Sequence, residues 1–462
     1  MYSAAGASLL LVPSRPHHTF SKYSFSAKHG LNCARYKLIL LFVSTFKLAA
    51  VKVRVGQGTS CKLAPATTCF NYTWVWYSST KTYTKAAATQ AAASTRTFTQ
   101  MKYLFAILLA LYLLVTFAAS AQTADSLGME EAEKPFKLSG GVDVYYAYDF
   151  SKPVDKDRLY TTQAFRHNEF NLNWGFLQAD YATDKVRATL ALHTGTYVQA
   201  NYAAEPNELT QLIAQANAGV KLAEGVWLDM GILPSHIGYE STFSLNNEIY
   251  TRALMAENSP YFETGAQLTA EVSDKVTMKF LVLNGWQNIQ ETNDAKSLGF
   301  GISYTPTDQL TLSYNNYYGN EAPDETDSKR RYFHNFYAAY TFSDRFNLAG
   351  SVDYGRQELW DSREQGSWYA GMVLARYRLS EKFALAGRVE HYNDEDQIII
   401  STQSPNGFQT SSASLNFDYA PAPNFLWRVE ARGYDSKDRI FAGDEGIKDN
   451  NLLLVTSFAL KF

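Results

Sequence analysis

The sequence predicts an all-β fold, a transmembrane antiparallel β-barrel of about 16 strands that occupies residues 136–462. Three observations lead to this fold class. Apolar and polar residues alternate with a period of two, as in strands with one apolar and one polar face. Short polar turns separate these strands at regular intervals. Aromatic residues, 15% of the chain, gather near the predicted strand ends.

The first hundred residues differ in composition from the rest of the chain. Residues 1–100 carry 12 Lys and Arg and no Asp or Glu, which leaves 30 basic and 45 acidic residues, a net charge of −15, for residues 101–462. All three cysteines, Cys33, Cys61 and Cys69, lie in this first segment. We interpret it as an upstream extension that is translated from an early start codon, and we expect no fold there. A genuine basic extension is the alternative.

Residues 101–121 have the pattern of a secretory signal peptide. Met101 opens a short basic start, an apolar run covers residues 103–119, and Ala-Ser-Ala at 119–121 forms a cleavage site before Gln122. A transmembrane helix is the alternative, since the run is not far short of the roughly 20 residues that a span needs. The cleavage site and the start methionine favour a cleaved signal peptide, with Met101 as the true start.

After cleavage, the polar and acidic leader at 122–135 has no periodicity and is expected to be a short disordered arm. Alternation is clearest in four rows, which run from Val142 to Phe150, from Phe170 to Phe176, from Leu310 to Asn315 and from Phe425 to Glu430. In the second row, Phe170, Leu172, Trp174 and Phe176 form the apolar face, and a membrane barrel would turn that face to lipid. The best helix candidate, Asn207 to Ala216, is equally consistent with the start of a strand.

Turns of similar sequence punctuate the strands. They are Thr183-Asp184-Lys185, Ala223-Glu224-Gly225, Ser273-Asp274-Lys275, Thr307-Asp308-Gln309, Ser343-Asp344-Arg345, Ser380-Glu381-Lys382 and Ala422-Pro423-Asn424. From Ser273 to Ser380 they recur every 34 to 37 residues, with one longer polar segment between each pair. One such period holds two strands of about ten residues and a loop, as in transmembrane barrels. Eight outer loops and seven turns give 16 strands, and 14 is the alternative because 210–233 is the least regular stretch.

Two features favour a membrane barrel over a soluble β-sandwich. The aromatic clusters suit interfacial girdles; they are Tyr146, Tyr148 and Phe150, then Tyr314, Tyr317 and Tyr318, then Tyr332, Phe333 and Phe336. The chain ends in Phe462, preceded at two-residue steps by Leu460 and Phe458, and we expect these three to be the signal that the barrel-assembly machinery reads. Because unpaired backbone groups cost several kcal/mol in lipid, the sheet must close. Sixteen strands enclose a lumen too wide for side chains to fill.

Four sequence blocks between Asp229 and Glu321 resemble a known family. The blocks are Gly231–Ser241 (GILPSHIGYES), Ser259–Gly265 (SPYFETG), Asn284–Trp286 (NGW) and Asn293–Ser297 (NDAKS). In this order they resemble the porin-2 or OmpL-like outer-membrane β-barrels common in Bacteroidetes-type bacteria, and the resemblance extends more weakly to the C-terminus. Ile232 and Leu233 stand where many members have Phe or Lys. The resemblance implies an outer-membrane porin.

The longest loop, the third outer one, runs from Pro234 to Phe262 and is rich in ionisable and aromatic residues. The candidate site residues are His236, Tyr239, Glu240, Glu248, Arg252 and Glu257. In 16-stranded porins the third loop generally folds into the lumen and forms the constriction. We expect this loop to do so, with its three glutamates and Arg252 setting a charge-selective eyelet. The alternative is an external loop with solvated charges.

A second set of polar residues alternates with apolar neighbours and is therefore assigned to the lumen. These pore-lining candidates are Arg187, His193, Lys279, Asp353, Arg388, Glu390, Arg428, Glu430 and Arg432. On the lipid face, Lys or Arg would cost about 2 to 4 kcal/mol each at the midplane. Two roles are open for this set: mutual salt bridges across the barrel wall, or a transverse field that orients solutes.

The residues after the signal peptide show no pattern of an enzyme. Their five histidines, His167, His193, His236, His334 and His391, are scattered, without a nucleophile-elbow motif or metal-ligand spacing. We therefore predict no catalytic residues, no metal and no cofactor. A TonB-dependent transporter would need about 22 strands and a plug. Nucleic-acid partners do not suit so acidic a chain.

We predict an exported outer-membrane porin that forms a passive diffusion channel for small hydrophilic solutes. Its expected partners are outer-membrane lipid, the barrel-assembly machinery and those solutes, and the sequence leaves a homo-oligomer open. The alternative is a barrel with a ligand-binding or adhesion role through its outer loops. The acidic balance of residues 101–462 hints at a preference for cations.

Overall fold

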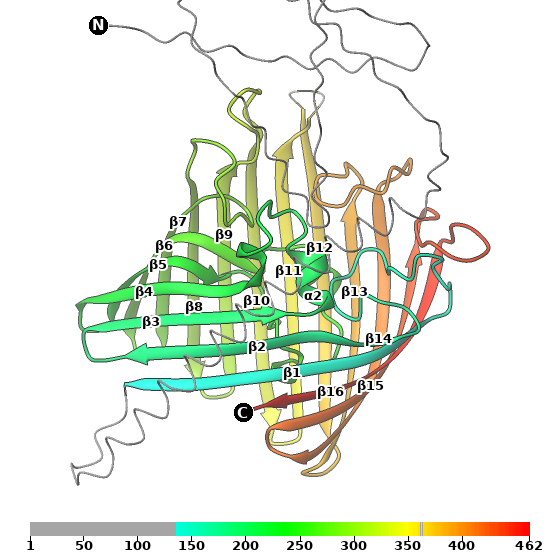
Figure 1. The fold of residues 1–462 in the computed structure, drawn as a ribbon, viewed down its shortest axis with the longest axis horizontal. Coiled ribbons are helices and arrows are strands. Elements are labelled where there is room, and N and C mark those ends of the chain that lie inside the picture. Colours follow the sequence, from blue (N-terminus) through cyan, green and yellow to red (C-terminus); the bar gives the residue numbers. More distant parts are fainter. Residues whose placement is uncertain (1–134, 361, 363) are drawn as a thin grey trace, which may run out of the picture. The chain divides into compact units, whose positions relative to one another are not determined.

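A computed structural model of the protein describes residues 135–360, 362 and 364–462. These residues form sixteen antiparallel strands in one closed barrel, in which each strand pairs with its neighbours in sequence and β16 returns to pair with β1 (Figure 1). The predicted fold class and strand number are thereby confirmed. The expected extension (1–100), signal peptide (101–121) and leader, apart from Pro135, lie outside the described residues.

The bounds of the elements follow the predicted turns closely. The strands are β1 (Phe136–Asp149), β2 (Phe170–Ala182), β3 (Val186–Thr194), β4 (Ile213–Ala223), β5 (Val226–Pro234), β6 (Phe262–Ser273), β7 (Val276–Leu283), β8 (Ser297–Thr307), β9 (Leu310–Asn320), β10 (Arg330–Ser343), β11 (Phe346–Glu358), β12 (Gln365–Arg378), β13 (Phe383–Asp394), β14 (Phe408–Ala422), β15 (Phe425–Ser436) and β16 (Asn450–Lys461). The helices are short: α2 (Thr196–Asn201), α3 (Leu254–Glu257) and the 3-10 turns η2 (Thr210–Leu212) and η3 (Ser244–Asn246). In the described part of the chain, no helix is long and apolar enough to cross a membrane.

The recurring turn sequence has a local cause. In these turns a hydroxyl side chain accepts a hydrogen bond from a backbone N–H two or three residues later: Val186 N donates to Thr183 Oγ1 at 3.1 Å, and Phe383 N donates to Ser380 Oγ at 3.2 Å. Short Ser and Thr side chains favour turns through such bonds. The strands can therefore reverse direction within two or three residues at this end of the barrel.

Alternation along the strands separates an outer apolar face from an inner face. On the outer face, Val373, Val389 and Leu415 are each more than half exposed, at 52%, 60% and 62%. Their sequence neighbours on the inner face, such as Arg388 and Glu390, are buried. An apolar exterior around a polar interior is the arrangement of a transmembrane barrel.

The expected outward row of β2 is wrong for two of its four residues. The pairing of β1 with β2 shifts register between Asp143 and Val144, where Asp143 pairs with Trp174 and Val144 with Leu172. Such a β-bulge inserts one extra residue and turns the following side chains to the other face. Trp174 is consequently buried inside the barrel, and Phe176 packs against it there, while Phe170 stays exposed.

The predicted aromatic girdles need a similar correction. Tyr317 and Phe333 are buried within the barrel, whereas their neighbours Tyr318 and Tyr332 are exposed and pack together, with ring centroids 4.8 Å apart. Adjacent residues of a strand point to opposite faces, so a run of consecutive aromatics can supply only alternate members to the outer surface.

The stretch from Asn207 to Ala216, which suited a short helix and the start of a strand equally, leads into β4. Only the single turn η2 forms there, and the chain enters β4 at Ile213. The helical turn of this connection lies earlier, in α2, which follows Gly195. Gly195 has a φ of 133°, a left-handed conformation that glycine adopts most readily.

Candidate functional site

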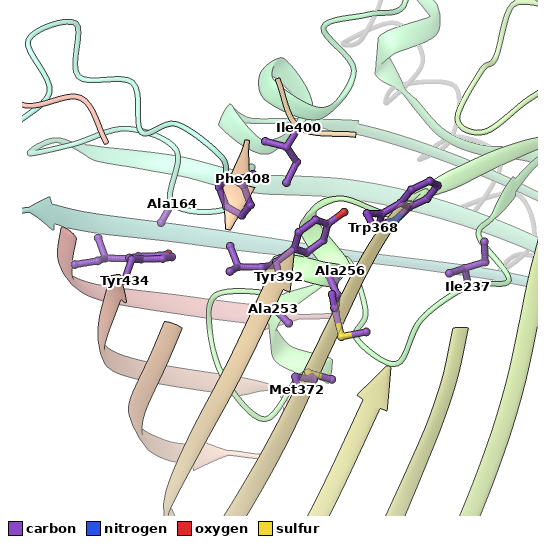
Figure 2. Packing of buried hydrophobic residues seen from close by; sticks show 14 of the residues in the cluster. Ala164, Ile237, Ala253, Ala256, Trp368, Met372, Tyr392, Ile400, Phe408 and Tyr434 are labelled. Carbon is purple, nitrogen blue, oxygen red and sulfur yellow. The ribbon is translucent and has the colours of Figure 1, made fainter. Parts of the chain in front are cut away.

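The connection from β5 to β6, residues 235–261 and hereafter loop 3, lies inside the barrel. Tyr250 and Ala253 are fully buried, and the α3 residues that follow are buried as well. Figure 2 shows Ala253 and Ala256 of loop 3 lying beside Met372 of β12 and Tyr392 of β13, in one cluster of buried apolar residues. An external loop with solvated charges would leave these residues exposed.

Two arginines on the inner face, on strands separated by β14, hold the middle of loop 3. Arg388 of β13 donates from Nη1 to Thr251 O at 2.7 Å and from Nη2 to Arg252 O at 3.2 Å. Arg432 of β15 donates from Nη1 to the same Arg252 carbonyl at 2.8 Å. Glu390 lies between the two arginines, with Oε1 at 3.2 Å from Arg388 Nε and 2.5 Å from Arg432 Nη2.

A third arginine, Arg428 of β15, holds the part of loop 3 around η3. Its Nη1 donates to the carbonyl oxygens of Ser244 at 2.5 Å and Ile249 at 3.2 Å, and its Nη2 donates to that of Asn247. The charge is balanced by Asp418 of β14, whose Oδ1 lies 3.0 Å from Arg428 Nε. Carbonyl groups that an irregular loop would leave unpaired in the lumen are thus satisfied by the wall.

Two glutamates of the wall accept the backbone N–H groups of the same segment. Glu430 accepts from Thr251 N at 2.8 Å and from Thr251 Oγ1 at 2.6 Å. Glu390 accepts from Leu254 N at 2.5 Å. Strands β13 and β15 therefore match both the donors and the acceptors of loop 3, so the loop is fixed in position rather than only packed.

Glu240, within loop 3, completes this network. Its Oε1 lies 3.0 Å from Arg388 Nη1, and its Oε2 accepts from Ala253 N at 2.7 Å. Burial raises the pKa of Glu240 above its usual range, and the Arg388 guanidinium opposes that rise. The carboxylate is fully engaged by these contacts.

The start of loop 3 is held on the opposite side of the barrel by His236. Its Nδ1 lies 2.8 Å from Glu263 Oε2 on β6, and its Nε2 lies 2.8 Å from Asn316 O on β9. A Cβ added at Gly299 of β8 would lie only 2.9 Å from the imidazole, so this glycine lets the ring approach the wall. Burial lowers the pKa of His236, but the Glu263 carboxylate more than offsets this, and the pKa is raised overall.

The remaining predicted residues of loop 3 point to other partners. Glu257 accepts from Thr162 N at 2.8 Å and from Tyr261 OH at 2.7 Å, which ties loop 3 to the first outer loop, 150–169. Glu248 accepts from Tyr239 OH at 2.6 Å. Arg252 has its guanidinium 3.9 Å from the centroid of the Tyr261 ring.

The other pore-lining candidates lie on inner faces away from the arginine cluster. Arg187 of β3 pairs with Asp229 of β5, with Nη2 and Oδ2 2.5 Å apart. Asp353 of β11 accepts from Asn335 Nδ2 at 2.7 Å. Lys279 lies on β7, in the same row as the buried Leu281 and Leu283. The structure thus brings five of the nine residues, on β13 and β15, to loop 3. It places His193 in the wall of the cavity beside loop 3 and the other three elsewhere on the inner face.

A cavity of about 280 Å³ remains between loop 3 and the wall that β1 to β5 form. Its lining includes Trp174, Phe176 and His193 from the wall and Glu240 and Arg252 from loop 3. Within the described residues this is the place where the loop and the facing strands leave space beside the predicted eyelet residues.

Sequence reasoning missed several residues of this site. Trp174 and Phe176 were assigned to lipid, yet Gln178 and Asp180 continue the same row and would have faced lipid too. Polar residues in a row assigned to lipid indicate that side chains of this row turn to the other face of the sheet within β2. Glu263 was missed because its role depends on a contact with His236, which no local pattern reveals.

The five histidines in the described part of the chain have separate partners. His334 and His391 lie on the outer face, where His391 Nδ1 is 3.0 Å from Ser411 Oγ and His334 Nδ1 is 2.7 Å from Tyr314 OH. In the part of the chain that the structure describes, no group of three or more His, Cys, Asp or Glu is arranged to hold a metal ion.

Comparisons with known proteins place this geometry among porins. The model of the family "Putative beta-barrel porin-2, OmpL-like" matches residues 135–462. Similar solved structures include an anion-selective porin from Comamonas acidovorans, with 11% identity, a TM-score of 0.49, and coverage of 71% of this chain and 99% of that one. The outer membrane channel DcaP of Acinetobacter baumannii has 12% identity, a TM-score of 0.48, and coverage of 70% and 97%.

Salmonella typhi OmpF, in complex with daunomycin, is similar with 12% identity, a TM-score of 0.47, and coverage of 71% of this chain and 97% of that one. At identities and TM-scores this low, these similarities have no bearing on what the chain transports. No curated protein matches the chain.

Proposed function

This chain belongs to the putative β-barrel porin-2, OmpL-like family and is an outer-membrane porin, and we propose that it is a passive diffusion channel for small hydrophilic solutes in which loop 3 forms the constriction. The observation that carries this proposal is the attachment of loop 3 inside the lumen. Arg388, Arg428 and Arg432 bind its carbonyl groups from the wall. A loop held in this way narrows the aqueous path permanently, and charged side chains at such a point select ions.

The test is the single-channel conductance of refolded residues 122–462 in a planar bilayer. Deletion of residues 242–258 removes most of loop 3, including the carbonyl groups that the three arginines bind, and is expected to raise the conductance of discrete, ohmic openings. A shorter control deletion, of residues 325–327 at the exposed tip of the loop between β9 and β10, should leave the conductance unchanged. Equal conductance of the loop 3 deletion and the parent would refute the role of loop 3 as the constriction.

We also propose that the chain is exported by a cleaved signal peptide at 101–121. The supporting observations are the basic start, the apolar run and the small residues before Gln122. The measurement is the intact mass of the protein extracted from outer membranes, which is expected to correspond to a chain that begins at Gln122. A mass that includes residues 1–100 would refute both the cleavage site and the interpretation of that segment.

A further inference from the structure

The cavity beside loop 3 contains a cation without an ionic partner. Arg252 is 4% exposed, and its Nε and Nη1 atoms have no hydrogen-bond partner. Its Nη2 makes one long contact, 3.5 Å to Glu240 O. Among the described residues, no carboxylate forms an ion pair with it within 4.0 Å. A buried guanidinium with unmet donors is unfavourable unless another molecule supplies the acceptors.

The other ionisable groups that line the cavity form no ion pair with Arg252; outside the lining, the carboxylate of Glu257 attracts it but binds Thr162 and Tyr261. Glu240 is the carboxylate of the lining, and it already binds Arg388 and the Ala253 amide. His193 accepts from Trp174 Nε1 on its Nδ1 at 2.9 Å, so its single proton lies on Nε2 and the ring is neutral. The remaining ionisable side chains of the lining are phenols and Lys461, which adds a second positive charge.

Aromatic rings form much of the cavity wall next to Arg252. Trp174 stacks on Phe176, with centroids 4.6 Å apart and an interplanar angle of 22°. The ring of Tyr197 lies 5.3 Å from that of Tyr261, whose face carries the Arg252 guanidinium. These rings come both from the wall and from loop 3, so a solute in the cavity would meet flat apolar surfaces on more than one side.

We propose that this cavity is a solute-binding subsite for small aromatic carboxylates, in which Arg252 binds the carboxylate and the aromatic rings hold the planar body. Guanidinium and carboxylate groups form charge-assisted, often bidentate hydrogen bonds, and planar rings stack on aromatic side chains. The volume of about 280 Å³ is close to the lower end, roughly 300 Å³, of small-molecule sites. This inference rests on the proposed channel function and gives that channel its substrate class.

The subsite also has a local charge opposite in sign to the net charge of the chain. The net charge of −15 for residues 101–462 includes exposed loops and turns, whereas permeation depends on the charge at the narrowest point. In the lining of the cavity, Glu240 is paired with Arg388, whereas Arg252 forms no ion pair. Glu257 attracts Arg252 from outside this lining, where it binds Thr162 and Tyr261. The cavity, rather than loop 3 as a whole, is therefore the place where the channel favours anions.

The experiment uses refolded residues 122–462 in a planar bilayer, with benzoate as the probe and with acetate and benzamide as matched probes that lack the ring or the charge. Benzoate is expected to reduce the KCl current at a concentration at least about tenfold lower than either matched probe. Arg252→Gln is expected to abolish that difference and to shift the reversal potential in a KCl gradient toward K⁺. Lys221→Gln, near the end of β4 and outside the cavity, is the control and should behave as the parent.

Arg252→Lys keeps the charge and is expected to retain the anion preference while it binds benzoate more weakly. Heat-modifiable gel mobility verifies that each variant is folded; should Arg252→Gln not fold, the lysine variant and Trp174→Leu provide the comparison. Equal potency of the three probes, or a folded Arg252→Gln channel that behaves as the parent, would overturn the inference. A complete lack of current would instead refute the proposed channel. Equilibrium dialysis of benzoate against the folded protein would then test the subsite alone. Binding that Arg252→Gln abolishes would support the subsite, and no binding would overturn it.

Discussion

At the scale of single residues, this barrel uses buried charges to hold an irregular segment in a fixed place. Arg388, Arg432 and Glu390 are buried on the inner face, and each binds both a charged partner and a backbone group of loop 3. A buried ion pair adds little net stability over well-packed apolar residues, but removing one partner is strongly destabilising. The network is therefore better explained as positioning of loop 3 than as a source of barrel stability.

Substitution of Arg388 by Met tests this explanation. The change leaves Glu240 without its guanidinium partner and frees the Thr251 carbonyl, so unfolding in detergent should be easier by about 3 to 5 kcal/mol. Loop 3 should also become mobile, and the single-channel conductance should become larger and noisier. Arg345→Met, at an exposed turn, is the matched control. A quiet channel of parental conductance would contradict the positioning role.

The His236–Glu263 pair gives the anchoring of loop 3 a pH dependence. Both ring nitrogens of His236 face acceptors, so the imidazolium form fits the site best, and its pKa is raised by Glu263 against burial and the nearby Lys279. Since the folded-state pKa exceeds the unfolded value of about 6.5, the protonated pair contributes its full stability below pH 6.5 and loses it as the pH rises through the raised pKa.

The urea midpoint of unfolding in detergent is therefore expected to fall between pH 6 and pH 9 in the parent. His236→Gln should flatten this part of the profile, and His334→Gln, on the outer face, should leave it unchanged. The same pH slope in parent and His236→Gln would show that another group titrates.

At the scale of the elements, strands and turns can be predicted from local sequence patterns, whereas features that depend on neighbouring strands cannot. The alternation of apolar and polar residues and the hydroxyl side chains of the turns predict the strand number. Both patterns are local, because the two faces of a strand can be recognised from that strand's own residues. The bulge after Asp143 and the partners of His236 depend on neighbouring strands, so no single row predicts them. For the same reason parity assigned Arg388 to the lumen but could not identify loop 3 carbonyls as its partners.

The last strand carries a prediction of its own. Phe462 exchanges backbone hydrogen bonds with Gly140 at 2.8 and 2.9 Å, and Phe458 and Leu460 lie in its outward row. We predict that the terminal aromatic is read during assembly, so Phe462→Ala is expected to lower the amount of folded barrel in outer membranes several-fold, measured by heat-modifiable mobility. Refolding of the purified chain in detergent should change little, and Phe342→Ala on the exposed outer face is the control. A parental level of assembled Phe462→Ala would refute the assembly signal.

At the scale of the whole molecule, closure is what permits both the membrane fold and the site. A closed sheet leaves no unpaired strand edge in lipid, and here closure joins segments from the two ends of the described chain, since β1 pairs with β16 from Gly141–Lys461 to Asp149–Leu453. Sixteen strands enclose a wide lumen, and that width is what allows a 27-residue connection, 235–261, to fold inside it. The constriction that we propose is therefore formed by loop 3, whereas the wall supplies its anchors and the aromatic side of the cavity.

The register of closure can be tested with one engineered disulfide. Along an antiparallel pair of strands, hydrogen-bonded and non-hydrogen-bonded residue pairs alternate. Gly140 and Phe462 exchange both hydrogen bonds, and Ala147 and Val455 lie an odd number of residues further along. Ala147 and Val455 therefore form a non-hydrogen-bonded pair, in which the Cα atoms lie about 4.5 Å apart. That separation suits a disulfide, and all three native cysteines lie before residue 101. Cysteines at both positions in residues 122–462 should oxidise to one intramolecular bond, detected by mass spectrometry and by a change in the gel mobility of the unfolded chain that reductant reverses.

The out-of-register pair Ala147→Cys with Leu453→Cys is the matched control, because Leu453 lies opposite Asp149 on the same inner face. It should oxidise much more slowly. Because a shift of two residues preserves which side chains face the lumen, only cross-linking of this kind separates the two registers. Preferential oxidation of the control pair would mean that β1 and β16 close in another register, and the positions of β2, its bulge and the aromatic wall of the cavity would shift with it.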